Sequence, residues 1–578
     1  MFNRNDRIYS KMTGADIRRA FLIGGLAGIL VFVACYGVSI LNVTNDAWLL
    51  SGEDITQHYI GWKFYRVSEW TFPIGQIQGI LYPQTSCIIY SDSLPILAIF
   101  FKILSPVLPE TFQYFGIAGL ISFFLVGAFT GLIVRRSCES LCFCFLAGGL
   151  TCFMPCLLYR MFIHTALAGQ WIILAAIAIW VYRPFFTARR RRIFIWTLLL
   201  VVGSLNHIYY IPMVLLFFFG FALQDLIAGE DWIGDLITAS VSIGADLLVL
   251  YVVGAFSANT AMEDTGLGVY SANLNSLINP LNHSRFLKLL PCADGQLEGF
   301  GYLGLGFLIL TVIALLLGIY TAIRRAHRMG ILEERPVEKG RSLRTDGEKA
   351  EDISCRRQRA AAWISLSAVF ILGALLALSP VVRLGKTELV TIPYPDFILS
   401  LLSIFRTSGR FIWCICYLIA VLVILSIGRI VKKQWAVPLL AGVLVLQAVD
   451  IWPLVTFRRT LLEPKTENTM MHSSQWETLA EGKAHLTILP WSTVQGMNGV
   501  PAAYEVGNFA VDHSMTINYF PIARIDYEKL AEEDGVLRQK AENREDEDTL
   551  YILDAREAGE VLGLVVYEID GYYVGVRE

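Results

Sequence analysis

Long apolar runs separated by short polar loops fill most of the chain. A helix needs about 20 consecutive apolar residues to cross a bilayer, and we assign about eleven such spans. They are residues 20–41, 115–134, 141–158, 166–182, 193–208, 209–224, 233–256, 302–323, 360–381, 411–428 and 435–452. The apolar segment 94–104 is shorter, and we expect it to be re-entrant or interfacial. The pattern predicts an all-α polytopic membrane bundle over residues 1–455, with 42–93 as its first outer loop.

The pattern changes after Trp452–Pro453. Residues 456–578 are charged and contain short strand-like runs, HLTILPW, TLYILD and GLVVYEIDGYYVGV, with polar helical stretches between them. This alternation predicts a small soluble α/β domain. For the whole chain of 578 residues, 55% are hydrophobic and the mean hydropathy is +0.54. Soluble globular proteins of this length are less apolar.

Basic residues indicate how the chain is oriented. Lys and Arg cluster in alternate loops, at Arg18–Arg19, Arg135–Arg136, Arg189–Arg192 and in 324–359. Because short cytoplasmic loops carry an excess of Lys and Arg, this side is expected to be the cytoplasm. The protein is therefore expected in the bacterial cytoplasmic membrane, with the N-terminus inside and residues 456–578 outside. We expect span 20–41 to be a retained signal anchor, because it is too long for a cleaved signal.

The first outer loop combines acidic, imidazole and aromatic side chains beside a membrane surface. Glu53, Asp54 and Asp92 could act as general bases or hold a cation, and His58 and Trp62 lie close by in sequence. The simpler interpretation is that these are solvated loop carboxylates. We favour a functional interpretation because the acidic pair, the histidine, the aromatic run and a second aspartate coincide.

Later outer segments add cationic groups. Arg160 and His164 are four residues apart, which would place both on one helix face for phosphate binding. Arg406 and Arg410 show the same spacing at the mouth of a span and suit a phosphate or pyrophosphate. The alternative for these arginines is interfacial anchoring. His207 occupies a short outer turn and is more often structural at such a position.

Two acidic positions complete the candidates. Glu298 follows an Asn-, Gly- and Tyr-rich stretch in loop 257–301 and stands just before a span. Asp246 lies deep within span 233–256, where a carboxylate is a functional candidate by default. The sequence has no Walker-type phosphate loop, no GxGxxG after a predicted strand, and no HExxH or GxSxG motif, so these enzyme classes find no support.

Several motifs together resemble a known type of protein. They are GEDITQHYIGWKFYR, YSDSLP, NLNSLINP, GQLEGFGYLGLG and FRTSGRF. The chain resembles an uncharacterised family of bacterial multi-pass membrane proteins, which is similar in layout to the GT-C glycosyltransferases. The resemblance implies Asp54 as the catalytic residue with Glu53 as its neighbour. It also implies that Glu298 assists with metal or acceptor, and that Arg406 and Arg410 meet a lipid phosphate.

The leading hypothesis is a membrane glycosyltransferase, transferring a hexose or pentose from a polyprenyl-phosphate donor to a cell-surface glycan or lipid. Asp54 would be base or metal ligand, and the cofactor, if any, would be Mg²⁺ or Mn²⁺ on Asp54 and Glu298. Donor phosphate is assigned to Arg406, Arg410, Arg160 and His164. Acceptor or sugar contacts are assigned to His58, Trp62, Asp92, Glu298 and His207.

Other classes of protein remain open at this point. The main alternative is a non-catalytic transporter or flippase of lipid-linked saccharide. The mid-depth carboxylate Asp246 favours this alternative. A scaffold protein would leave the loop acids without a role. Membrane lipid is an expected partner, and nucleic acid is not.

Overall fold

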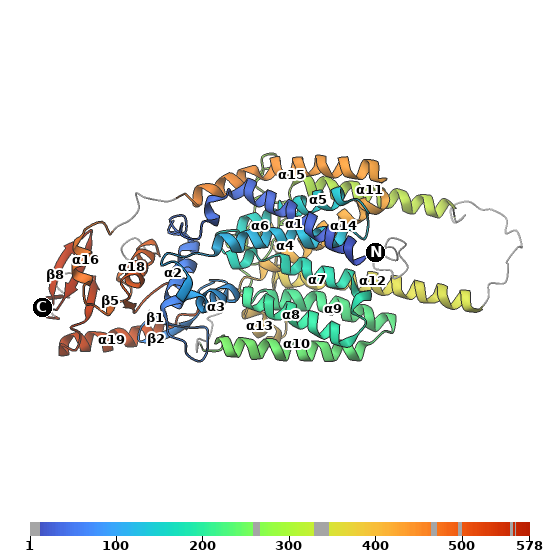
Figure 1. Ribbon diagram of the computed structural model, residues 1–578. Coiled ribbons are helices and arrows are strands. Elements are labelled where there is room, and N and C mark those ends of the chain that lie inside the picture. The colour runs from blue at the N-terminus through green and yellow to red at the C-terminus, as the bar shows by residue number, and fades with distance from the viewer. Residues whose placement is uncertain are drawn as a thin grey trace, which may run out of the picture.

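The computed structural model describes residues 12–257, 266–328, 346–463, 471–494, 500–554, 559–560 and 562–577. Figure 1 shows an elongated helical bundle with a small sheet at one end, which we call the sheet end. The N-terminal helix starts near the opposite end. The last strand lies in the sheet, so the first and last described residues are far apart (Figure 1).

Within the described residues, eight helices are long and apolar enough to cross a membrane. They are α1 (Gly14–Tyr36), α4 (Phe115–Val134), α9 (Tyr210–Ala228), α10 (Trp232–Val253), α11 (Leu305–Arg328), α12 (Asp346–Leu378), α14 (Ile412–Ile430) and α15 (Lys433–Leu461). The predicted helical bundle is confirmed at this level. The expected count of about eleven spans is not.

The difference arises at three of the expected spans. The run 141–158 is divided into α5 (Leu141–Cys152) and α6 (Pro155–Arg160), with Pro155 at the start of the second helix. The run 166–182 holds a 3₁₀ turn, η4 (Thr165–Ala168), and then α7 (Trp171–Val181). The helix α8 (Arg189–Asn206) begins with four arginines, which leaves an apolar part too short for a span.

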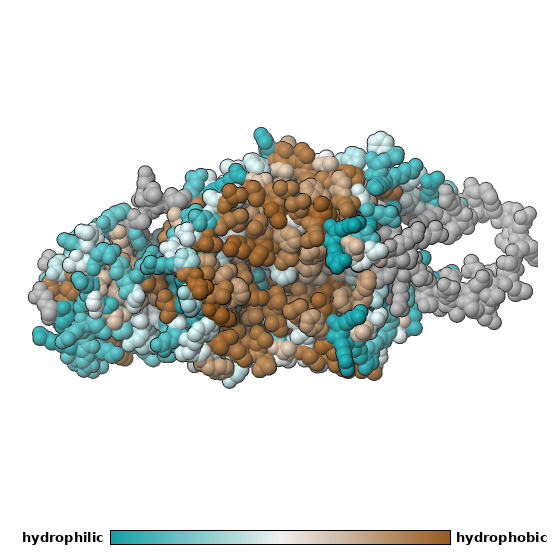
Figure 2. Space-filling view, in the orientation of Figure 1, coloured by the Kyte–Doolittle hydropathy of each residue, from teal (hydrophilic) through white to brown (hydrophobic). Residues whose placement is uncertain are grey.

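The outer surface of the bundle matches a membrane environment. Figure 2 shows a broad apolar belt across the middle of the face in view, with hydrophilic surface toward both ends. Large apolar side chains such as Leu248 on α10 and Leu315 on α11 are more than 60% exposed. Contiguous apolar surface of this extent is expected to be covered, here by lipid.

Glycines bring α1 and α4 into close contact. A Cβ atom on Gly24 would lie 2.3 Å from the carbonyl oxygen of Gly127, and one on Gly28 would lie 2.1 Å from that of Phe123. Small residues four apart allow two membrane helices to approach at the backbone. The interface therefore depends on the absence of side chains at these positions.

The segment after α1 folds onto the sheet end of the bundle. It contains η2 (Ser39–Leu41), α2 (Asp54–Val67), the antiparallel hairpin β1 (Gln76–Leu81) and β2 (Gln84–Cys87), and then α3 (Pro95–Ile103) and η3 (Ser105–Val107). Asp54 begins α2, where a negative charge is favoured by the helix dipole. Buried residues of α2, including Ile60 and Tyr65, attach this loop to the core.

Further short elements lie between the long helices. They are η5 (Arg183–Phe186), η6 (Gln296–Gly299), the hairpin β3 (Val381–Leu384) and β4 (Thr387–Thr391), α13 (Asp396–Ser403) and η7 (Ser408–Phe411). The last of these continues directly into α14.

The C-terminal segment forms the expected sheet. Its strand order is β6-β5-β7-β9-β8, with β5 parallel to β6 and β7, and β9 antiparallel to β7 and β8. The strands are β5 (His485–Leu489), β6 (Thr516–Ile517), β7 (Thr549–Leu553), β8 (Val565–Ile569) and β9 (Tyr572–Val576). The helices are α16 (Gln475–Ala480), α18 (Val500–Asp512) and α19 (Tyr527–Asn543). The strand-like runs identified in the sequence are thus confirmed.

The C-terminal sheet region packs against the first loop. Lys63 on α2 donates to Asn508 at 2.8 Å and forms an ion pair with Asp512, both on α18. The Tyr82 amide, in the β1–β2 turn, donates to the carbonyl of Ile517 in β6 at 2.8 Å. These contacts place α2, with Asp54 at its first turn, between the bundle and the sheet (Figure 1).

Candidate active site

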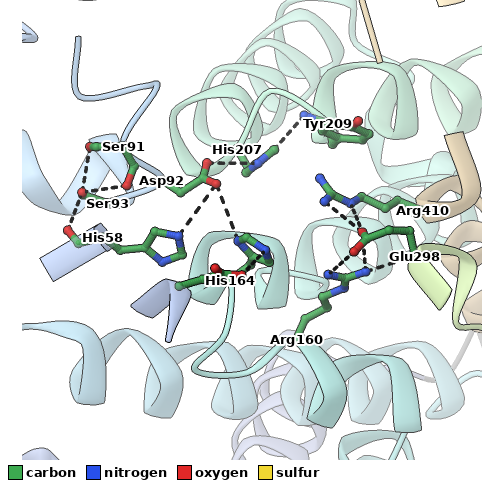
Figure 3. Close-up of polar contacts among 11 residues, drawn as sticks. His58, Ser91, Asp92, Ser93, Arg160, His164, His207, Tyr209, Glu298 and Arg410 are labelled. Carbon is green, nitrogen blue, oxygen red and sulfur yellow. Dashed lines mark hydrogen bonds and ion pairs between the residues drawn. The ribbon is translucent and has the colours of Figure 1, made fainter. Parts of the chain in front are cut away.

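Polar side chains from separate segments meet at the sheet end (Figure 3). Asp92 lies at their centre. Its Oδ1 is 3.3 Å from Nε2 of His207, which follows α8. Its Oδ2 is 3.7 Å from Nδ1 of His164 and 3.9 Å from Nε2 of His58 on α2. We call Asp92 and the three histidines, together with Asp54, the carboxylate–histidine cluster.

The backbone holds Asp92 in an unusual conformation. Its φ is +53°, in the left-handed region that few non-glycine residues adopt, although aspartate tolerates it better than most. The Ser93 hydroxyl donates to the His58 carbonyl at 2.6 Å and contacts the Ser91 hydroxyl at 2.8 Å. These bonds attach the turn to α2, so Asp92 and His58 are positioned together. Such conformations are concentrated at functional sites.

Asp54 is the accessible carboxylate of the cluster. It lies one helical turn before His58 on α2, and its Oδ2 is 3.3 Å from Nε2 of His164. About half of the Asp54 side chain is exposed, whereas Asp92 is more enclosed. The contact with His164 lowers the pKa of Asp54. The group is therefore ionised at neutral pH and can accept a proton from a bound hydroxyl.

The histidines differ in their charge state. Burial lowers the pKa of His58 to about 4, and burial also lowers the pKa of His207. Burial acts in the same direction on His164, but Asp54 and Asp92 outweigh it and raise the pKa of that ring. Burial would raise the pKa of Asp92, yet the surrounding histidines hold it well below its usual value. The cluster thus combines ionised carboxylates with two imidazoles that burial keeps neutral, His58 and His207, and a third, His164, whose pKa is raised.

A second group lies beside the first. Arg160, at the end of α6, places Nη2 2.7 Å from Oε2 of Glu298, and Nη2 of Arg410 is 3.0 Å from the same oxygen. Burial would raise the pKa of Glu298, but the two guanidinium groups lower it to about 2. The three side chains, the arginine–glutamate group, carry a net charge of +1. Such a group attracts an anion.

Tyr209 connects the two groups. Its amide donates to Nδ1 of His207 at 3.2 Å, and its ring lies 4.7 Å from the guanidinium carbon of Arg410. Its hydroxyl accepts from the Thr407 amide at 3.0 Å. Tyr209 therefore contacts both His207 and the loop before α14.

Most of the residues singled out in the sequence meet at this place. The structure brings together Asp54, His58, Asp92, Arg160, His164, His207, Glu298 and Arg410 (Figure 3). They come from parts of the chain more than 350 residues apart. Their assigned roles in donor and acceptor binding stay predictions.

Three other residues proposed from the sequence lie outside these two groups. The Arg406 side chain is exposed and lies over the Tyr270 ring at 6.0 Å. Helix geometry does not align it with Arg410, because the chain becomes helical only at Ser408. Trp62 is fully buried and donates Nε1–H to the Phe112 carbonyl at 3.1 Å, so it packs within the core. Glu53 is the N-cap residue of α2.

The two carboxylates suggested as metal ligands belong to different groups. Glu298 is engaged by Arg160 and Arg410, whereas Asp54 faces His164. Within the described chain, the groups close enough to share an ion are instead His58, Asp92 and His164. The two histidines were assigned from the sequence to other roles, because their proximity to Asp92 depends on tertiary structure.

Sequence reasoning missed some supporting residues. Ser91 and Ser93 flank Asp92, and the Ser-Asp-Ser spacing was a usable signal, because short hydroxyl side chains stabilise turns. Tyr209 gave no such signal. Tyr504 of α18 lies close to Asp54. Burial raises the pKa of Tyr504, and the negative charge of Asp54 raises it further. This proximity shows that the C-terminal sheet region adjoins the site.

The chain belongs to a family described as a domain of unknown function, DUF6311, which matches residues 25–452. Residues 475–577 match the DUF6311 C-terminal domain. No curated protein matches the chain. The family description names neither an activity nor a ligand.

Proposed function

We propose that this protein is a membrane glycosyltransferase that uses a polyprenyl-phosphate sugar as donor. The observation that carries the proposal is the meeting of the carboxylate–histidine cluster and the arginine–glutamate group at the sheet end (Figure 3). Their charges interact, since Arg160 acts on the pKa of His164. Sugar transfer from a lipid phosphate requires both a proton acceptor and a site for the phosphate that leaves.

The proposed reaction assigns one task to each group. An acceptor hydroxyl transfers its proton to Asp54, and its oxygen forms a bond to C1 of the donor sugar. The bond between C1 and the phosphate oxygen breaks with its electron pair, which leaves polyprenyl phosphate. Arg160 and Arg410 stabilise the negative charge that develops on this phosphate. The sugar inverts at C1, because the acceptor attacks opposite the departing phosphate.

The position relative to the apolar belt supports a lipid-linked donor. Helix α2, which carries Asp54 and His58, lies between the helical bundle and the C-terminal sheet (Figure 1), so a polyprenyl chain could remain in the membrane while its phosphate meets the arginines. In the proposed orientation this end faces the outside and the acceptor is a surface glycan or lipid. The distribution of Lys and Arg among the loops supports that orientation.

The transporter alternative rests mainly on one mid-depth carboxylate. Asp246, the mid-depth carboxylate on α10, accepts a hydrogen bond from Ser204 of α8 at 2.6 Å. This bond accounts for Asp246 as a contact between two helices. We therefore carry the transferase alone.

The proposal is tested by transfer from defined donors. Purified protein in nanodiscs is given polyprenyl-phosphate glucose, mannose, galactose or arabinose with a radiolabelled sugar, and membranes of the host serve as acceptor. Asp54→Asn should reduce transfer about 10²–10⁴-fold, because a positioned base is lost. Arg410→Lys should weaken donor use while keeping the charge, because an ammonium lacks the guanidinium fork.

Asp396→Asn is the matched control, since Asp396 is an exposed carboxylate in the first turn of another helix, α13. It should leave transfer unchanged. Full activity of the Asp54→Asn variant would remove Asp54 from the mechanism. Absence of transfer and of polyprenyl phosphate release from all four donors would contradict the proposal.

A further inference from the structure

His58 is a buried imidazole whose nitrogens lack hydrogen-bond partners. Its side chain is 1% exposed, and within the described part of the chain neither Nδ1 nor Nε2 has a hydrogen-bond partner. Leaving a buried polar group unsatisfied costs about 1–3 kcal/mol. Native proteins rarely retain such a group unless something else binds it.

The spacing around Asp92 fits a cation better than direct hydrogen bonds. Nε2 of His58 and Nδ1 of His164 lie 3.9 and 3.7 Å from Oδ2 of Asp92, whereas a hydrogen bond measures about 2.7–3.2 Å. Ligands of a tetrahedral ion with bonds of about 2.0–2.2 Å stand roughly 3.4 Å apart. The three atoms all lie within 4.8 Å of one another, so the two contacts to Asp92 would shorten by a few tenths of an ångström and the widest pair by up to about 1.4 Å to close around an ion.

Outer partners orient two of the three groups. Nε2 of His164 faces Asp54 at 3.3 Å, which directs Nδ1 toward Asp92. Nδ1 of His207 accepts the Tyr209 amide, so Nε2 carries the proton and faces Oδ1 of Asp92. Oδ2 of Asp92 therefore faces His58 and His164. A carboxylate behind a histidine is the usual support of a metal-binding imidazole.

We propose that His58, Asp92 and His164 bind one divalent transition-metal ion, Zn²⁺ or a related first-row ion. Two imidazoles and one carboxylate suit such ions, whereas Mg²⁺ prefers oxygen ligands. Three protein ligands leave a position open, as in catalytic zinc sites. A bound ion would supply Lewis-acid stabilisation to an oxygen beside the arginine–glutamate group. This inference goes beyond the proposed glycosyl transfer and does not rest on it.

Metal binding can be measured without any substrate. The full-length protein in detergent is stripped with a chelator and titrated with Co²⁺, whose visible absorption reports ligand type and geometry. We expect one Co²⁺ per chain, with absorption typical of nitrogen and oxygen ligands. Zn²⁺ should displace the Co²⁺, and millimolar Mg²⁺ should not.

Variants separate the ligands from their supports. His58→Gln and Asp92→Asn should abolish the absorption, and Asp54→Asn should retain it with affinity reduced about 10–100-fold. His513→Gln is the matched control, because His513 also faces a carboxylate, Glu477, at 2.7 Å but lies away from Asp92 in the C-terminal region. It should bind one Co²⁺ as the wild type does.

The outcomes are distinct from those of the transfer assay. If the wild-type protein takes up no Co²⁺, the metal site is overturned, whatever the transfer activity of the protein. This result does not depend on whether any variant folds. Equal binding by wild type and His58→Gln overturns it as well. If the wild-type protein binds one Co²⁺ and both ligand variants bind none, the metal site is supported, even if no sugar donor tested is used.

Discussion

Two guanidinium groups share the Glu298 carboxylate, and the Arg160 side chain among them is only 3% exposed. Removing the carboxylate would leave a buried cation without its partner, and a buried unpaired charge is strongly destabilising. The strength of this arrangement lies in desolvation, because exposed pairs of the same chemistry contribute little.

We therefore expect Glu298→Ala to lower the free energy of unfolding by about 1–3 kcal/mol. The pKa of Glu298 is lowered to about 2, against about 4.3 in an unfolded chain. Its stabilising effect is thus fully present above about pH 4.3 and is lost as the pH falls toward 2. Denaturant unfolding of wild type and variant at pH 7, 4 and 3 should show the difference shrinking.

The control for this measurement is Glu388→Ala. Glu388 pairs with Arg383 at 3.7 Å, but its side chain is 52% exposed, so little change is expected at any pH. Equal effects of the two substitutions would mean that burial of Arg160 contributes nothing.

At the scale of elements, helix contacts depend on where side chains are missing. A Cβ on Gly127 of α4 would lie 2.3 Å from the carbonyl oxygen of Gly24 on α1. No rotamer change can relieve a clash with backbone, so the helices would have to separate. Packing between membrane helices is a main source of their association.

Gly127→Val should therefore destabilise the bundle by about 1–3 kcal/mol, seen as a lower melting temperature in detergent. Gly442→Val on α15 is the matched control, because no atom lies within 4 Å of a Cβ built there. An unchanged melting temperature for Gly127→Val would show that α1 and α4 do not pack as described.

Elements also decide what the sequence could predict about the site. The spacing of four predicts Arg160 and His164 on one helix face, but α6 ends at Arg160, so His164 lies beyond the helix. The same argument failed for Arg406, because the chain is not yet helical there. Apolar runs predicted a helical bundle, but the break before Pro155 shortened one expected span. The meeting of His164, Asp92 and Glu298 depends on tertiary packing, which no local pattern encodes.

At the scale of the whole molecule, the C-terminal sheet region is joined to the first loop. The Lys63–Asp512 ion pair and the Gln84–Glu533 hydrogen bond of 2.8 Å link them on two sides. Phe64 and Phe520 belong to one buried cluster that continues into the bundle. The sheet therefore covers the region of α2 that carries Asp54.

A carbodiimide, which couples an amine directly to a carboxylate, should join Lys63 to Asp512 in the purified protein. Mass spectrometry of the digest should find this cross-linked peptide, because the two groups are already in contact. Lys63→Arg keeps the charge but cannot be coupled, and should lose it. A wild-type protein that reacts at other pairs but not at this one would contradict the docking.

This docking has a consequence for how the protein is made. The partners Lys63 and Asn508 are 445 residues apart, and ribosomes add about 5–20 residues per second. Roughly 20–90 s therefore pass between the synthesis of Ile60 and Phe64 and the synthesis of the segment that buries them. During that time this apolar face of α2 lacks the cover that the C-terminal region later provides. The C-terminal region that adjoins the candidate active site is therefore added only after every residue of that site has been synthesised.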